Sequence, residues 1–309
     1  MMALVQRCPK IDRAGRALQE NGPQALFCVV EDGKTIASAL TGVDRRAVRI
    51  SGAMRGYFAQ FEAQPRQDAV SMLFAGIAQW QRAQGMSAVF GPIAVDGSGF
   101  EMGVKQAGFD RRRELLNPDN PPYYDPLLRD AGLAVETRWL SFEFDIEAIA
   151  ARRYMEAANW ARSRHGIHIE RLRPLQDRRD CERLYAAMEI DGRIEQEAFA
   201  AQLQRISGYM GAGRVLLASV DGAPRGMLMA LHDRRQRHVR IATVHVMQAY
   251  QGTPVLVALM GGMAQALGEM RPRRLSASLI DETNERSVAV AMGAFGQIGG
   301  AYCQYVGRF

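Results

Sequence analysis

The 309-residue sequence has few cysteines and no closely spaced pair of them. Its four cysteines are scattered along the chain and form no Cys-X-X-Cys motif: Cys8, Cys28, Cys181 and Cys303. This spacing argues against both a disulfide framework and a zinc site, so no metal is expected. The natural compartment for such a chain is a reducing cytoplasm.

The sequence also lacks a long hydrophobic run. No stretch is long enough to span a bilayer, and the N-terminal residues show no basic-then-apolar secretion pattern. A hydrophobic content of 48% and a charged content of 23% are those of a soluble globular protein. The length is sufficient for two domains of ordinary size, each with its own core.

Acidic residues are outnumbered by basic ones, 33 to 39, which leaves a net charge of +6 carried mostly by arginine. This balance favours an anionic partner, such as a nucleotide cofactor, an acidic carrier protein or a lipid surface. A generally basic, solvated surface explains it equally well. Nucleic acid is not an expected partner, because the arginines are dispersed and no recognised binding module is present.

Short strands and helices alternate irregularly along the chain, which predicts an α+β (mixed α/β) fold. A strand–turn–strand pattern at 30–40 returns at 220–231, and both halves later show a helix, a glycine and an aromatic strand. The repeat predicts two tandem domains, each a mixed, mostly antiparallel sheet flanked by helices. The predicted boundaries are 1–147 for the first domain, 148–165 for a linker helix and 166–309 for the second domain.

The stretch from Val246 to Met260 is the most informative part of the sequence. It is typical of a strand end, a short polar turn and an amphipathic helix, with Thr253 as the cap and Pro254 as the first helical residue. Apolar residues at helical spacing form one stripe: Leu256, Leu259, Met260, Met263 and Leu267. A helix that begins directly after a strand offers free N–H groups to a phosphate.

This stretch resembles motif A of the GNAT (GCN5-related N-acetyltransferase) superfamily. The resemblance implies that Val246, Gln251, Gly252 and Thr253 bind the pyrophosphate of acetyl-CoA or another acyl-CoA. The sequence departs from the motif at Gln248, where proline is usual, and at two positions usually occupied by small residues, Pro254 and Leu256. The basic residues Arg240 and Arg271–Arg274 are candidates to lie near this turn.

The rest of the chain resembles a bacterial family of tandem GNAT-like proteins. The matching motifs are Gly91-Pro92-Ile93, Gly108-Phe109-Asp110, Asp119 to Tyr124, Glu282-Thr283-Asn284 and Tyr302 to Tyr305. The resemblance implies that the first domain has no donor site and that the second carries a degenerate acyl-CoA motif. Some members of the family resemble N-acyltransferases of sphingolipid synthesis, which implies that a long acyl chain is one option for the donor.

Acyl transfer to an amine needs a base for the ammonium and an acid for the leaving thiolate. His245, at the end of the strand before the turn, is the candidate base because imidazole titrates near neutral pH. A strand histidine bonded to a backbone group is the alternative interpretation. The tyrosine that acts as the acid in many GNAT enzymes would fall at Ala291, so Tyr302 or Tyr305 is the candidate acid. Two further histidines, His168 and His238, have arginines nearby in the sequence and are predicted to lie on the surface.

The remaining candidates concern the two substrates. Asn284 would either bind the pantetheine arm of the donor or cap its helix. Glu189 and Asp191 are candidate acceptor-pocket residues, with solvated helix ends as the alternative. Tyr123 and Tyr124 would line a substrate cleft or pack under a loop.

Two functions follow from these residues. The first is an N-acyltransferase that uses acyl-CoA or acyl carrier protein and acts on a small-molecule or lipid-like amine, with peripheral membrane contact as a further expectation. The second is a catalytically inactive tandem GNAT-like protein that binds a ligand or partner in its central cleft.

Overall fold

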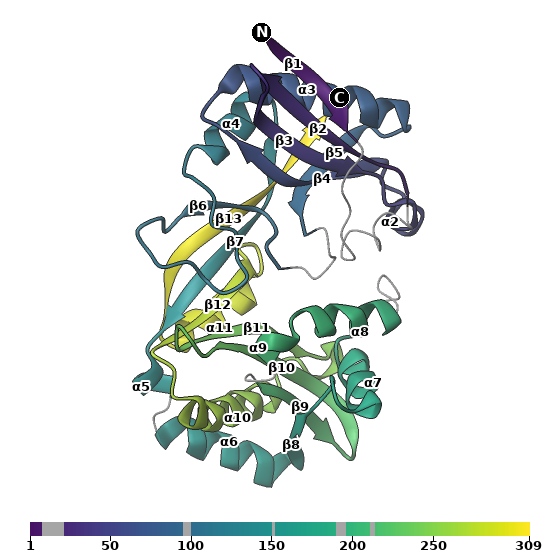
Figure 1. Ribbon diagram of the computed structural model, residues 1–309. Helices are drawn as coiled ribbons and strands as arrows, with labels where there is room; N and C mark the ends of the chain where they lie inside the picture. The colour runs from purple at the N-terminus through teal and green to yellow at the C-terminus, as the bar shows by residue number, and fades with distance from the viewer. Residues whose placement is uncertain (8–21, 95–99, 150–151, 190–195, 211–213) are drawn as a thin grey trace. The chain divides into compact units, whose positions relative to one another are not determined.

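The computed structural model describes residues 1–7, 22–94, 100–149, 152–189, 196–210 and 214–309. Contacts divide the chain into two units (Figure 1). The first unit holds Met1–Leu140, Asp281–Thr283 and Gly299–Phe309, and the second holds Ser141–Ile280 and Asn284–Ile298. Each unit is a mixed, mostly antiparallel sheet with helices against it, which confirms the predicted fold class.

The sheet of the first unit has the strand order β1-β2-β3-β4-β5-β13, and only β4 and β5 are parallel neighbours. Its main helix, α3 (Gln67–Ala83), lies on β2 and β3 and buries an apolar face. The strands are β1 (Met2–Arg7), β2 (Gln24–Glu31), β3 (Lys34–Gly42), β4 (Arg55–Ala63), β5 (Ala88–Ile93) and β13 (Gly296–Arg308), with β6 (Val104–Ala107) also paired to β13. The two short helices are α2 (Arg45–Ser51) and α4 (Tyr124–Asp130).

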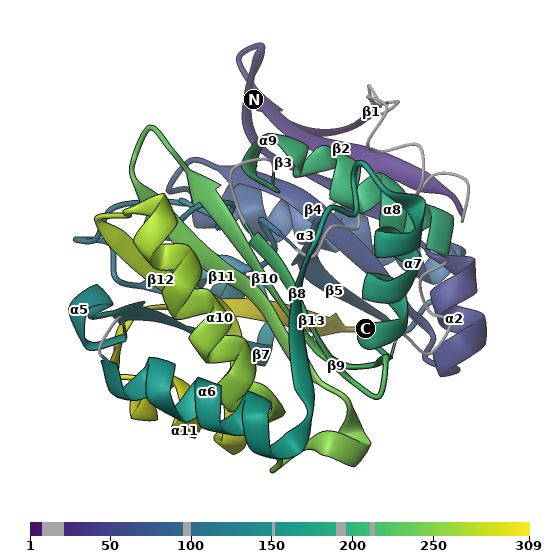
Figure 2. The same ribbon diagram turned by 90° about the horizontal axis from the view of Figure 1, so that it is seen from below.

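The sheet of the second unit has the order β12-β11-β10-β9-β8, and only β11 and β12 are parallel neighbours. Helices α6 (Arg152–His165) and α10 (Val255–Met270) lie side by side on one face of this sheet (Figures 1 and 2). Helices α7 (Arg178–Ala187), α8 (Gln196–Arg205) and α9 (Ser207–Met210) lie on the other face. The strands are β8 (Ile167–Leu172), β9 (Arg214–Val220), β10 (Ala223–Asp233), β11 (His238–Val246) and β12 (Arg274–Asp281).

Helix α10 forms the centre of the second unit's core. Leu259, Met263 and Leu267 recur at i, i+4 and i+8, and each has at most 2% of its surface exposed. Burial of such side chains contributes about 1.5–3 kcal/mol each, so α10 is held mainly by this stripe. The two other residues of the predicted stripe, Leu256 and Met260, lie at its edges and are half-buried.

The two hairpins that suggested an internal repeat have the same turn. In the β2–β3 turn, Asp32 and Gly33 have φ values of 48° and 79°, and in the β9–β10 turn Asp221 and Gly222 have values of 51° and 75°. Two successive residues at positive φ define the type I′ turn, whose twist matches that of the strands and which favours Asp-Gly. The repeated sequence pattern therefore corresponds to a repeated structure.

The contact-based units differ from the predicted domain boundaries in two ways. The predicted linker helix belongs to the second unit, because α6 packs against α10. Residues 299–309, predicted in the second domain, belong to the first unit, because the end of β13 pairs with β5. The boundary near residue 140 falls within one strand, β7 (Ala134–Phe144).

Several short elements were not predicted. Strand β1 is exposed along most of its length and so shows no buried alternation, and α2 has no buried residue to give it an apolar stripe. Strand β6 lies within the predicted long loop at 93–122. Within the described ranges, every helix is too short or too polar to cross a bilayer.

Candidate functional site

Strands β11 and β12 separate toward one end of the second unit's sheet. They pair from His238↔Arg274 to Ile241↔Ala277, and none of the described residues beyond these pairs joins the two strands. The cause is a bulge in β11: Met229 faces Thr243 while Ala230 faces Ile241, so Ala242 is an extra residue. A bulge bends its strand and adds twist, and here it lies where the pairing with β12 ends.

His245 and Glu189 meet at the open end of β11. The Nε2 atom of His245 lies 3.0 Å from Oε2 of Glu189, and each side chain is about one-third exposed. The same carboxylate oxygen accepts the backbone N–H of Gln248 at 2.9 Å. The two residues are 56 positions apart in the chain, so folding brings together the predicted base and a predicted acceptor-pocket residue.

The contacts of Glu189 keep it ionised. The N–H of Gln248, followed by the His245 ring, lowers the pKa of the Glu189 carboxyl below its usual value. A carboxylate can only accept hydrogen bonds, so it selects the tautomer of His245 that carries its proton on Nε2. That tautomer leaves Nδ1 with a lone pair, as a general base requires.

The turn after β11 differs in detail from the prediction. A short 3₁₀ helix, η1 (Gln248–Tyr250), follows the strand, and α10 begins at Val255 with Pro254 in the cap position. The Thr253 hydroxyl does not cap α10; it donates to the Tyr250 carbonyl at 2.6 Å. The predicted cap was therefore wrong, because the turn itself takes up this hydroxyl.

Free N–H donors remain at this turn. Within the described ranges, the N–H groups of Gly252, Leu256 and Val257 have no backbone acceptor. The first N–H groups of any helix lack intrahelical partners, and the dipole there favours an anion. Pro254 contributes no N–H, so the set of donors is smaller than a glycine there would give.

Two arginines next to the turn were not predicted. The Arg225 guanidinium lies 4.5 Å above the Tyr250 ring, and Arg286 donates to the side-chain oxygen of Gln251. Arg286 is in the first turn of α11 (Glu285–Gly293), where a cation opposes the helix dipole. A cation at this position in a helix is unfavourable, and this is the one sequence signal that could have identified Arg286 as a functional residue.

The basic residues expected near the turn lie elsewhere. Arg271 is the C-cap of α10, at the opposite end of a 16-residue helix. At 1.5 Å per residue that helix is about 24 Å long, so Arg271–Arg274 cannot reach the turn. The prediction was wrong for these residues because they follow the far end of α10. Arg240 is 1% exposed and pairs with Ser276, in the part of β11 that is still joined to β12.

His238 also differs from its prediction. It is 1% exposed rather than on the surface, and its Nε2 lies 2.8 Å from the Ser276 hydroxyl. Strand β11 is an inner strand of the sheet, between β10 and β12, so its first residues are covered. His168, by contrast, is exposed as predicted.

Two donor-site candidates have structural contacts. The Asn284 side chain accepts the Ser287 N–H at 3.1 Å and caps α11, which is the second of its two predicted roles. Val246 pairs with Gly226 and packs against the core of the second unit. Asp191 lies outside the described residues.

The tyrosine candidates belong to the first unit. Tyr302 is 2% exposed and pairs with Lys105 in β6, and the Tyr305 hydroxyl donates to Asp125. The Tyr123 hydroxyl donates to the Ala63 carbonyl at 3.2 Å, and that of Tyr124 accepts the Ala63 N–H at 3.1 Å. Tyr123 and Tyr124 therefore have core contacts, which matches the packing alternative.

The first unit repeats the strand–helix–strand arrangement with opposite charge at the helix start. Strands β4 and β5 flank α3 as β11 and β12 flank α10. Asp68 lies in the first turn of α3, where it accepts from Arg66 and from the Ala69 N–H, both at 2.9 Å. A carboxylate therefore already lies at the helix start, where it occupies one N–H group and would repel a phosphate.

Close packing holds the end of β11 in place. A Cβ added at Gly226 would lie 2.8 Å from the His245 carbonyl oxygen and 3.0 Å from Cγ1 of Val255. Glycine at this position therefore allows β10 to approach both β11 and the start of α10.

We expect Gly226→Ala to lower the free energy of unfolding by about 1 kcal/mol, the lower end of the cost of overpacking. Urea titration measures this. The control is Gly268→Ala on α10, where an added Cβ meets no atom within 4 Å and should be neutral or slightly stabilising. Equal losses in both variants would show that the contact with His245 is not the cause.

Among the described residues, no group of three His, Cys, Asp or Glu side chains gathers as metal ligands do. No family model matches the sequence, and no curated protein matches it. Solved structures do match the fold. A tandem GNAT protein from the clavulanic acid biosynthesis pathway is 10% identical, with a TM-score of 0.59 over 98% of this chain and 89% of that one.

Two further structures agree. A GCN5-related N-acetyltransferase from Sphaerobacter thermophilus is 15% identical, with a TM-score of 0.56 over 92% of this chain and 80% of that chain. A glucosamine N-acetyltransferase region of a fungal multi-domain β-N-acetylglucosaminidase is 12% identical, with a TM-score of 0.64 over 99% of this chain and 38% of that chain. The predicted tandem GNAT fold is thereby confirmed.

Proposed function

We propose that the second unit of this GNAT-fold chain is an N-acyltransferase that takes an acyl group from acyl-CoA and transfers it to an amine. One observation carries the proposal. The bonded pair of His245 and Glu189 lies at the open end of the separated strands β11 and β12, next to the turn that begins α10. This arrangement supports a base, a donor channel and an anion site together.

The turn fits the phosphates of the donor. Its free N–H groups at Gly252, Leu256 and Val257 lie at a helix start, where an anion is stabilised. Arg225 and Arg286 add two positive charges beside the turn, which offset the N–H that Pro254 lacks. Asp68 takes the equivalent place in the first unit, so we place the donor in the second unit only.

The pair supplies the proton chemistry. Nδ1 of His245 takes a proton from the substrate ammonium, and Glu189 stabilises the imidazolium that results. The amine nitrogen then forms a bond to the thioester carbonyl carbon, and the carbon–sulfur bond breaks. The second amine proton goes to the departing thiolate, which balances the reaction without a separate acid from the first unit.

A binding protein without catalysis is the second candidate. It is favoured by Pro254 and Leu256, which occupy the two positions where the GNAT motif has small residues. Such a protein would bind a CoA compound and transfer nothing. Acyl carrier protein remains an alternative donor, which the same assay can include.

We expect Arg286→Ala to weaken acetyl-CoA binding about 10-fold, because it removes a cation next to the phosphates. Isothermal titration of wild type and variant measures this. Arg179→Ala is the matched control, since Arg179 is likewise the second residue of a helix in the same unit. If acetyl-CoA, longer acyl-CoAs and acyl carrier protein all fail to bind the wild type, the proposed donor site is wrong.

A further inference from the structure

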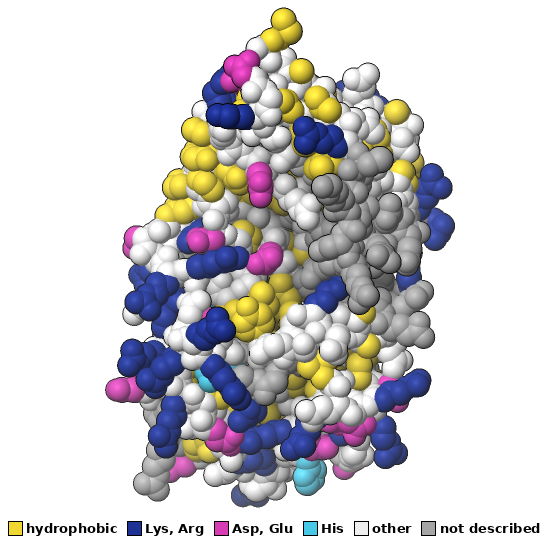
Figure 3. Space-filling model, viewed as in Figure 1, with side chains coloured by type: hydrophobic (Ala, Val, Ile, Leu, Met, Phe, Trp, Pro, Cys, Tyr) yellow, Lys and Arg dark blue, Asp and Glu magenta, His cyan; other side chains and the backbone are white. Residues whose placement is uncertain are grey.

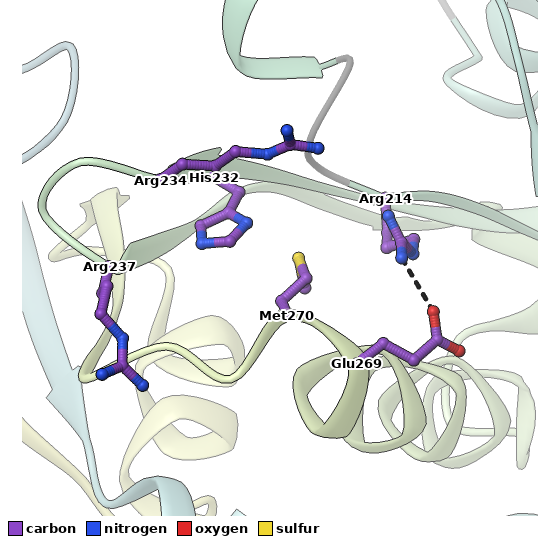
Figure 4. Close-up of a pocket in the computed structure, with 6 residues that line it drawn as sticks. All are labelled: Arg214, His232, Arg234, Arg237, Glu269 and Met270. Atoms are coloured by element: carbon purple, nitrogen blue, oxygen red, sulfur yellow. Dashed lines mark hydrogen bonds and ion pairs between the residues drawn. The ribbon is translucent and has the colours of Figure 1, made fainter.

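A pocket of about 400 Å³ lies at the other end of α10 (Figure 4). We call it the arginine pocket; its lining is Arg214, His232, Arg234, Arg237, Glu269 and Met270. These residues come from the start of β9, the end of β10, the turn between β10 and β11, and the last turn of α10. About 24 Å of helix separates the pocket from the turn next to His245, so it is a different site.

The single acid of the arginine pocket is already engaged. Glu269 accepts from Arg214 at 2.8 Å and from Arg171 at 3.0 Å. These two arginines lower the pKa of the Glu269 carboxyl to about 2, so it remains ionised across the physiological range. One carboxylate therefore faces the three arginines that line the pocket.

The other two arginines differ from each other. Arg237 is fixed, because its Nη2 donates to the Arg271 carbonyl at 2.9 Å. Arg234 is exposed, and within the described ranges its guanidinium has no hydrogen bond or ion pair. Figure 4 shows the Arg234 side chain running along the rim above Met270.

The surface around the pocket is also basic. Arg235 and Arg271 adjoin lining residues in sequence, and the Arg273 N–H donates to the carbonyl of Arg237 at 2.6 Å. Figure 3 shows several Lys and Arg side chains together over the second unit. The carbonyl end of α10 alone would repel an anion. The arginines outweigh this repulsion, so the pocket favours an anion. Their number fits a ligand with more than one negative charge.

We propose that the arginine pocket binds a phosphate monoester. Three lining arginines and one glutamate leave a formal charge of +2, and a monoester carries about −1.5 to −2 at neutral pH. A guanidinium presents a planar fork of donors that matches phosphate oxygens. The volume lies within the roughly 300–1,000 Å³ of small-molecule sites, so there is room for the group that carries the phosphate.

The phosphate can belong to a soluble metabolite or to a lipid headgroup. Glycerol 3-phosphate and phosphatidic acid present the same monoester in these two forms. We would titrate the protein with glycerol 3-phosphate in one experiment and, in another, measure co-sedimentation with phosphatidylcholine vesicles that contain phosphatidic acid. Neither experiment uses an acyl donor, so the result does not depend on the transferase activity.

Arg234→Ala is the test variant, because it breaks no internal bond of the described structure. We expect it to weaken monoester binding at least about 10-fold, the usual loss for a charged hydrogen bond. Arg235→Ala, the next residue in the same turn but outside the lining, should stay within about 2-fold of wild type. Arg286→Ala should do the same, since it lies at the donor turn.

The dependence on pH gives a second readout. Binding of glycerol 3-phosphate should strengthen as pH rises through about 6, where the monoester gains its second charge. If the wild type binds the vesicles and Arg234→Ala does not, the phosphate belongs to a lipid headgroup. If the wild type binds glycerol 3-phosphate but not the vesicles, the phosphate belongs to a soluble metabolite. The proposal is overturned if neither form binds the wild type, or if Arg235→Ala or Arg286→Ala weakens binding as much as Arg234→Ala.

Discussion

Replacement of His245 by alanine is expected to lower kcat by roughly 10²–10⁴-fold, the usual contribution of a general base. Acetyl-CoA binding should hardly change, because the donor contacts lie on the turn and on α11 rather than on the imidazole. An assay of released thiol, run with a panel of amines, measures the rate, and titration with acetyl-CoA measures the binding.

Glu189→Gln separates positioning from proton transfer. The amide keeps the size of the side chain but loses the charge that selects the tautomer of His245 and stabilises its protonated form. We expect a smaller loss of kcat than for His245→Ala and a shift of the acidic limb of the pH–rate profile to lower pH, because the imidazolium loses its neighbouring negative charge. A His245→Ala variant with the wild-type rate would remove the base assignment, and a wild type without any transfer would support the binding protein.

The second large effect concerns stability at acid pH. Burial, then Arg274 and Arg240, lowers the pKa of His238 to about 4, partly opposed by Glu143 and Asp233. The unfolded chain binds a proton at this residue near pH 6.5, whereas the folded chain does not bind it until about pH 4. Stability is therefore unaffected above pH 6.5, falls as pH drops from 6.5 to 4, and levels off below that range.

When the pH is lowered from 7 to 5, the protonation of this residue in the unfolded chain should reduce the free energy of unfolding by about 2 kcal/mol. His238→Gln removes the titrating group and can still bond to Ser276, so the variant should lose about 2 kcal/mol less than wild type over the same interval. Urea titrations at both pH values measure the difference. His168→Gln, at an exposed position of the same unit, is the control. An identical pH dependence in wild type and His238→Gln would refute the assignment.

Local signals in the sequence predicted local structure well. The two Asp-Gly turns, the apolar stripe of α10 and the strand before it follow from propensities that act within about ten residues. The resemblance to motif A singled out the turn that follows the strand carrying His245, and the structure has a strand end and a turn at these positions. It did not give the cap of α10, because the Thr253 hydroxyl has a competing acceptor within the turn.

Contacts between distant segments were harder to predict. Glu189 was selected only for its position between helices, and nothing local shows that its carboxylate bonds to His245. Arg225 and Arg286 reach the turn from β10 and α11. The position of Arg286 in the first turn of a helix is unusual for a cation, but it does not indicate which segment the side chain contacts. The burial of His238 likewise depends on strand order, which periodicity does not determine.

The membership of β13 in the first unit affects how the chain folds during synthesis. The strand next to β5 is made of residues that leave the ribosome roughly 160 positions after Leu140, which at about 5–20 residues per second is a delay of about 10–30 s. During that time β5 presents an unpaired edge, the kind of surface that invites aggregation. The nascent first unit therefore lacks the partner strand of β5 until the residues of β13 have been made.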